Sequence, residues 1–407
     1  MNFFCGIILF FTFVLIPSSE TANSPDYENP PVLQASEILP PDLPRSPVHR
    51  VREEVSTAGY HYHFIMESNF GLYDIESLDL LKIRVHEVKT LANVIEKNRT
   101  DEFFDSLGDH LFQTVSTPVQ ILQDPGGTLS ALGQGIGQHI QRIGRRFKDR
   151  NSSAQEDPGL RAKLISDEKR KAASELHLDV YSTNPKVQEF LDQIATARTR
   201  GDLVFKLGAF AIPGAAGLAV SAISYSNKVE DQLREKSPVD LYIDNEKKLL
   251  EMGMDSYWTG RFLNHPDLSP RHKTMITAAL EAMPGVAGKE VLLEAALDTE
   301  GQESMAWFQV NRIVLLSRCH INDMKLRQIT MIQGLPIAAS EQGRNILLLP
   351  IDIAYASEDA EAILQGLTRE RSGGWDLLLT GQLTPRARQK AESAGFRVVE
   401  GYGEAKN

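Results

Sequence analysis

The spacing of apolar residues divides the chain into a strand-forming start, a helical middle and a mixed end. At the start, YHYHFIMES (60–68) alternates between two sets of side chains and is followed by NFG and LYDIES, which predicts a β-hairpin. Residues 78–97 continue with helical spacing, and Ser77 is suited to cap that helix. The face that this helix should bury comprises Leu78, Leu81, Val85, Val88, Ala92 and Ile95. We therefore expect a hairpin-plus-helix domain over residues 51–122.

The middle of the chain, residues 158–322, is expected to be a helical domain. Apolar residues recur there at intervals of three and four, and Ser237 and Ser269 each precede a proline at a helix start. The segments differ in length and pattern, so no repeat of fixed period is present in the sequence. The predicted helices are 166–176, 185–196, 203–210, 238–252, 254–264, 269–282, 287–296 and 304–321.

The end of the chain, residues 325–407, is expected to form a small α/β domain. Two apolar, β-rich runs surround EQGRN (341–345) and indicate a second hairpin. Helix, strand, helix and strand patterns follow, and this alternation predicts parallel strands joined by right-handed crossovers. The fold class predicted for the whole chain is α+β, with an N-terminal β-hairpin plus helix, a mainly helical middle and a C-terminal α/β domain with parallel strands.

The N-terminus indicates export. Residues 3–16 are 14 uncharged and mostly apolar residues, a length that fits the hydrophobic part of a secretory signal and is short for a membrane span. We expect a signal peptide over residues 1–24, with an uncleaved N-terminal anchor as the alternative. The expected location is the periplasm or cell envelope. Both the cleaved chain and the chain with an uncleaved anchor could associate with a membrane there.

The residues after the signal are rich in proline. Seven prolines between Pro25 and Pro47 predict an extended spacer over residues 25–50. Removal of the signal also removes Cys5, which leaves Cys319 as the only cysteine. The exported chain can therefore form no intramolecular disulfide, and packing must stabilise it.

Composition narrows the function classes. With 42% apolar and 24% charged residues, the chain resembles a soluble globular protein. Its net charge of −11 argues against a nucleic-acid partner, because neutralising phosphates requires a basic face. The sequence contains no nucleophile elbow, phosphate-binding loop or HExxH pattern, and we expect no cofactor. The composition leaves the oligomeric state open.

Residues 123–150 form a glycine-rich, basic, amphipathic segment. An apolar stripe keeps helical spacing at Leu129, Leu132, Ile136, Ile140, Ile143 and Phe147. A basic stripe comprises Arg142, Arg145, Arg146 and Lys148. Four glycines lie in the same stretch, and each lowers helix stability by about 1 kcal/mol relative to alanine.

This pattern predicts a helix that becomes ordered on binding a membrane surface or an envelope protein partner, with lipid supplying the burial. The alternative is that the segment packs inside the protein, since glycines also allow close packing against another helix of the same chain. The uncharged run 207–227 contains 21 residues rich in small side chains and is long enough to span a membrane. It is interrupted by Pro213-Gly214, so we interpret it as two buried helices, with membrane insertion as the alternative.

Two groups of residues have the composition of a chemical site. In parallel sheets, ligands bind beyond the carboxyl ends of the strands, where the sequence places Asp352, Thr380, Gly381 and Thr384. On the predicted strand 60–68, one face should carry a possible set of metal ligands, namely His61, His63 and Glu67. The opposite face, with Tyr60, Tyr62, Phe64 and Met66, is the better core face.

The sequence favours an exported, non-catalytic, envelope-associated protein whose contact element is 129–148. One alternative is an enzyme or a ligand-binding protein with its site at the strand ends of the C-terminal domain. Another is a membrane-inserting protein that uses 207–227.

Overall fold

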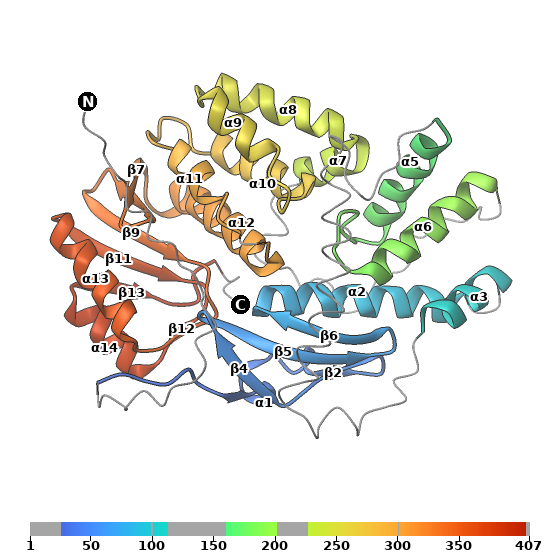
Figure 1. Cartoon of the computed structure of the whole chain (residues 1–407), viewed down its shortest axis with the longest axis horizontal. Helices are drawn as coiled ribbons and strands as arrows, with labels where there is room; N and C mark the ends of the chain where they lie inside the picture. The colour runs from blue at the N-terminus through green and yellow to red at the C-terminus, as the bar shows by residue number, and fades with distance from the viewer. Residues whose placement is uncertain (1–25, 99–100, 113–159, 202–226, 300, 404–407) are drawn as a thin grey trace, which may run out of the picture.

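The structure combines a curled antiparallel sheet at the N-terminus, a helical middle and a C-terminal mixed sheet with parallel strands and helices (Figure 1). It is a computed structural model and describes residues 26–98, 101–112, 160–201, 227–299 and 301–403. The α+β class predicted from the sequence is confirmed. The proposed domain boundaries stay a prediction.

The N-terminal sheet is built around one long strand, β5 (His61–Ser68). The predicted hairpin is confirmed, because β5 pairs along one edge with β6 (Gly71–Glu76). Its other edge pairs with β4 (Glu54–Ala58) and β3 (His49–Val51), and short strands β1 (Leu33–Gln34) and β2 (Arg45–Ser46) complete the sheet. Tyr62, Phe64 and Met66 are buried, as their alternation predicts.

Residues 33–50 are not the extended spacer that their prolines predict. They form β1, the short helix α1 (Ala35–Ile38), β2 and the start of β3. Ala35, Leu39 and Leu43 are buried in the main core. Proline is tolerated in edge strands and turns, so the apolar residues between the prolines decide where this segment lies.

Two helices follow the sheet. The long helix α2 (Leu78–Lys97) packs across β5 and β6, and the Ser77 hydroxyl caps it by accepting a hydrogen bond from the Leu80 N–H at 3.2 Å. Helix α3 (Glu102–Leu111) is absent from the sequence prediction. Its signal is nevertheless present, since Asp101 caps it and it buries Phe104, Leu107 and Leu111 at helical spacing.

The helical middle contains most of the helices predicted there. Ser237 and Ser269 both form capping boxes, so these two predicted helix starts are confirmed. The sequence prediction omitted α7 (Asn227–Glu235). The remaining helices in the described part of this region are α5 (Leu160–Glu175), α6 (Pro185–Arg200), α8 (Pro238–Glu251), α9 (Ser256–Leu263), α10 (Pro270–Glu281), α11 (Glu290–Ala295) and α12 (Glu303–Arg318).

Helix α12 lies at the centre of the molecule and is buried over most of its length. It continues into a π-helical turn, η4 (Cys319–Asp323), and Cys319 is a buried free thiol. On its other side, α12 faces the C-terminal sheet, so this helix joins the middle of the chain to its end.

The C-terminal sheet has the order β13-β11-β9-β8-β7. The predicted parallel pairing is confirmed for β9 (Arg344–Leu349), β11 (Gly374–Leu379) and β13 (Phe396–Val399). The predicted hairpin around 341–345 joins β8 (Leu335–Ser340) to β9, and β7 (Leu326–Ile332) extends the sheet in antiparallel fashion. Two short strands, β10 (Ile353–Ala354) and β12 (Gln382–Leu383), pair beside it.

Successive residues of the parallel strands belong to two different cores. Leu378 joins the main core on the α12 side, whereas Leu377 and Leu379 join a smaller core. Helices α13 (Glu358–Glu370) and α14 (Pro385–Ser393) contribute Leu367 and Ala391 to that smaller core. Burial on both faces explains the continuous apolar run in these strands.

Several sequence predictions concern residues outside the described ranges. These are the signal peptide (1–24), the amphipathic segment (123–150), the helix at 203–210 and the uncharged run 207–227 apart from its last residue. Of the helices in the described ranges, none has both the length and the apolar composition needed to cross a membrane.

Candidate functional site

Asp352 lies where the two sheets and α2 meet. One carboxylate oxygen, Oδ2, accepts hydrogen bonds from the backbone N–H of Tyr62 at 2.9 Å and of Leu78 at 3.0 Å. The same oxygen lies 3.4 Å from Nδ1 of His61. Since Leu78 is the first residue of α2, the carboxylate also faces the positive end of that helix. The structure thus brings together Asp352 and His61, which the sequence analysis assigned to two separate sites.

The backbone around Asp352 is held by Tyr60. The Tyr60 carbonyl accepts the N–H groups of Asp352 and Ile353, both at 3.1 Å, and its hydroxyl lies 2.8 Å from that of Ser357. Gly59 and Tyr60 have φ of 56° and 68°, the pattern of a two-residue hairpin turn. A left-handed conformation costs a tyrosine about 1 kcal/mol, and the contacts to Asp352 and Ser357 hold it in place.

His61 is buried, and its ring meets Phe308 edge-to-face with centroids 6.0 Å apart. Burial lowers the pKa of His61, but the hydrogen bond and negative charge of Asp352, together with the charges of Glu76 and Asp79, outweigh it and raise the pKa above its ordinary value. Burial has the opposite effect on the acid Asp79: it raises the pKa of this carboxyl, although the positive charge of Lys82 acts to lower it. Asn311 donates a hydrogen bond to Asp79 at 2.8 Å. The junction therefore holds a base and an acid whose protonated forms are both favoured.

Replacing His61 with glutamine should remove a pH-dependent part of the stability. Because the pKa of His61 in the fold is raised above the ordinary 6.5, its contribution is complete below that pH and is lost as the pH rises through the raised pKa. We expect His61→Gln to lower the free energy of unfolding by about 1 kcal/mol at roughly pH 5.5, and by less at roughly pH 8.5. Urea denaturation of both proteins at each pH measures this difference, and an equal loss at the two values would contradict it.

The proposed metal ligands do not come together. His61 faces Asp352, His63 pairs with Asp74, and Glu67 pairs with Arg52 at 2.9 Å. The hydrogen bond that the His63 ring donates to the Asp74 carboxylate raises the pKa of His63. In the part of the chain that the structure describes, no group of three or more histidine, cysteine, aspartate or glutamate side chains is arranged to hold a metal ion.

The strand-end residues are engaged in internal contacts. The Thr380 hydroxyl donates to the Ile351 carbonyl at 2.9 Å. Thr384 caps α14, and its hydroxyl donates to Glu28 at 2.6 Å. A Cβ atom on Gly381 would come within 1.9 Å of the Asp352 carbonyl oxygen, so only glycine fits there. The edge at which ligands bind in many parallel sheets is thus covered by this chain's own N-terminal residues.

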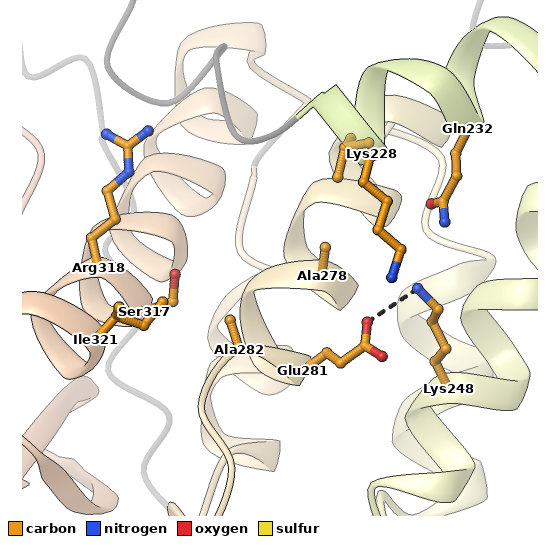
Figure 2. A pocket seen from close by; sticks show the side chains of 10 residues that line it. Lys228, Gln232, Lys248, Ala278, Glu281, Ala282, Ser317, Arg318 and Ile321 are labelled. Atoms are coloured by element: carbon orange, nitrogen blue, oxygen red, sulfur yellow. Dashed lines mark hydrogen bonds and ion pairs between the residues drawn. The ribbon is translucent and has the colours of Figure 1, made fainter.

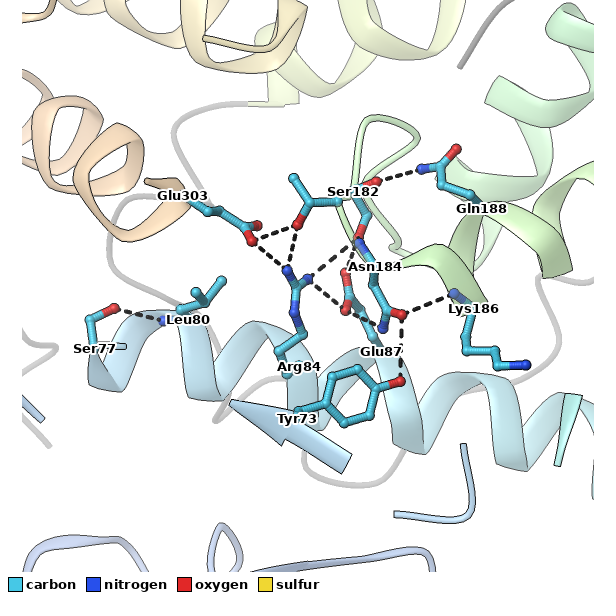
Figure 3. A network of polar contacts seen from close by, with 11 residues as sticks. Tyr73, Ser77, Leu80, Arg84, Glu87, Ser182, Asn184, Lys186, Gln188 and Glu303 are labelled. Atoms are coloured by element: carbon cyan, nitrogen blue, oxygen red, sulfur yellow. Dashed lines mark hydrogen bonds and ion pairs between the residues drawn. The ribbon is translucent and has the colours of Figure 1, made fainter. Parts of the chain in front are cut away.

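A second polar cluster joins α2 to the loop before α6 and to the start of α12 (Figure 3). Arg84 donates to Glu87 at 2.9 Å and to Glu303 at 2.6 Å, and all but a small part of the Arg84 and Glu87 side chains is buried. Asn184 donates to Glu87 at 2.9 Å. Burial raises the pKa of the neighbouring Tyr73 to about 12. The sequence analysis missed this cluster because its members are far apart in the chain and belong to no motif.

His61, Asp352 and Asp79 thus form a group of titratable side chains inside a structural junction. Comparison of the chain with protein-family models, with curated proteins and with solved structures found no match in any of the three.

Proposed function

We propose that this protein is an exported, non-catalytic, envelope-associated protein whose segment 129–148 binds an anionic membrane surface. One observation carries the proposal: the sequence of that segment sets an apolar stripe against a basic stripe. Apolar side chains would enter the lipid boundary, and each nearby basic side chain would add about 1 kcal/mol of attraction to anionic headgroups.

The helices that flank this segment in the sequence are consistent with the proposal. The segment lies in the chain between α3 and α5, and both of these helices pack against α6. The two flanking helices are therefore held by the same part of the fold.

The strand-end alternative has less support. A ligand site there would need the side chains of Asp352, Thr380 and Thr384, and each of them already has a partner within the protein. Opening the site would leave buried backbone N–H groups unpaired, at a cost of about 1–3 kcal/mol each. The membrane-inserting alternative through 207–227 predicts leakage of vesicle contents, which surface binding does not.

Vesicle flotation tests the proposal. We expect residues 25–407 to float with anionic vesicles at roughly 0.1 M salt, to stay behind with neutral vesicles, and to dissociate at roughly 1 M salt because the charges are screened. Replacing Arg142, Arg145, Arg146 and Lys148 with glutamine should weaken binding by roughly a hundredfold or more.

The matched control replaces four basic residues of the described body with glutamine, at Arg50, Arg200, Lys247 and Arg327, and should float like the unchanged protein. Absence of flotation with anionic vesicles would refute the membrane proposal and favour internal packing of the glycines. Flotation that persists in the segment variant would place the contact elsewhere, and release of vesicle contents would favour insertion.

A further inference from the structure

A cavity of about 320 Å³ lies between α7, α8, α10 and the turn where α12 becomes η4 (Figure 2). That volume lies within the range of small-molecule sites. Its lining includes Lys228, Gln232, Lys248, Glu281, Arg318 and Ile321. Three are basic and one is acidic, although the chain as a whole has a net charge of −11. The cavity is separate from the junction at Asp352.

Four polar side chains lie together at one end of the cavity, namely Lys228, Gln232, Lys248 and Glu281 (Figure 2). Lys248 forms an ion pair with Glu281 at 3.1 Å, and the ammonium group of Lys228 points toward the same carboxylate (Figure 2). Arg318 extends away from this group in the same view. Two lysines around one glutamate leave one positive charge in excess. Among the residues that the structure describes, neither the Lys228 ammonium group nor the Gln232 side-chain amide has a hydrogen-bond partner.

Most of the remaining lining is apolar, with Ser317 and Arg318 beside it. Val229 is 3% exposed, and Ala278 on α10 and Ala282, the C-cap residue of that helix, contribute only small side chains to the lining. Ile321 is 52% exposed at the rim. It lies in the π-helical turn, a conformation that is rare and often found at functional sites. An aliphatic ligand would cover the exposed part of this isoleucine.

We propose that this cavity binds an organic monocarboxylate with an aliphatic chain. The carboxylate would lie between Lys228 and Gln232, and the chain would lie on Ala278, Ala282 and Ile321. At the end of the cavity formed by Lys228, Lys248 and Glu281, the one excess positive charge matches one negative charge. A phosphate dianion would meet more repulsion from Glu281 than a monoanion does and would leave the apolar surface uncovered.

Calorimetric titration of residues 25–407 with sodium octanoate, acetate and inorganic phosphate tests this inference. We expect octanoate to bind, hexanoate to bind more weakly by about fourfold for each methylene group removed, and acetate and phosphate to give no saturable signal. Lys228→Gln should weaken octanoate binding about tenfold, because it removes a charge-assisted hydrogen bond. Glu281→Gln should strengthen it, because the excess charge rises.

Lys247→Gln is the matched control, since this lysine is exposed on α8 next to Lys248 but does not line the cavity. It should leave the affinity within about twofold. Ala282→Leu should abolish binding by filling the space, and circular dichroism shows whether this variant folds. The inference is overturned if octanoate fails to bind at millimolar concentration, if Lys228→Gln and Lys247→Gln have equal effects, or if phosphate binds as well as octanoate. Because every substitution in this test lies outside 129–148, vesicle flotation reports on the proposed function separately.

Discussion

Replacing Asp352 with alanine is expected to lower the free energy of unfolding by about 3–5 kcal/mol. The Asp352 side chain is only 10% exposed, and its Oδ2 atom accepts the N–H groups of Tyr62 and Leu78. Alanine leaves these donors and the His61 ring unpaired in a buried place. Urea denaturation followed by circular dichroism measures the loss.

Asp352→Asn separates the hydrogen bonds from the charge. The asparagine oxygen still accepts from the backbone, but the attraction to protonated His61 is lost. We expect this variant to lose about 1–2 kcal/mol at roughly pH 5.5 and less at roughly pH 8.5. If alanine and asparagine destabilise the fold equally, the carboxylate does not act through the backbone contacts described for it.

Replacing Arg84 with methionine is expected to cost a similar amount, about 3–5 kcal/mol. The side chains of Arg84 and Glu87 are 7% and 2% exposed, so the substitution leaves a buried carboxylate without its cation. Glu303 loses the same partner. The free energy of unfolding in urea again reports the effect.

A double variant provides the control. Arg84→Met combined with Glu87→Leu should recover part of the lost stability, because the double variant removes the buried carboxylate that the single substitution leaves without a cation. Lys247→Ala, which breaks an exposed pair with Glu251, should change stability by less than about 0.5 kcal/mol. A loss below about 1 kcal/mol for Arg84→Met would contradict a structural role for this cluster.

Local patterns in the sequence were sufficient for much of the fold. The alternation in β5 identifies its buried face. Ser237 and Ser269 each mark a helix start, because the capping serine, the proline after it and the third helical residue all lie within four positions of the chain. The parallel strands follow from the order of elements, since helical crossovers between β9, β11 and β13 leave few arrangements open.

The junction could not be predicted in the same way. Asp352 meets residues 290 and 274 positions away in the chain, and no periodicity links such distant positions. His61 was predicted to lie on the strand face opposite the better core face, yet it is buried, because Asp352 in the loop after β9 and Phe308 on α12 lie against it. Asp352 and His61 could each be identified as candidate site residues from the sequence, but only the fold determines that they lie next to each other.

The N-terminal residues have a consequence for how the chain completes its fold. Glu28 accepts hydrogen bonds from the Ala356 N–H at 2.7 Å and from the Thr384 hydroxyl, and its own N–H donates to the Ala356 carbonyl. Because these partners lie 328 and 356 positions later in the chain, Glu28 waits through most of synthesis to find them. A nascent chain shorter than about 350 residues carries these groups, and the donors that Asp352 will satisfy, exposed to water. Closure of the body thus waits until residues 352–384 have been synthesised. In the export that we propose, the chain would reach its final shape only after these residues have followed the rest across the membrane.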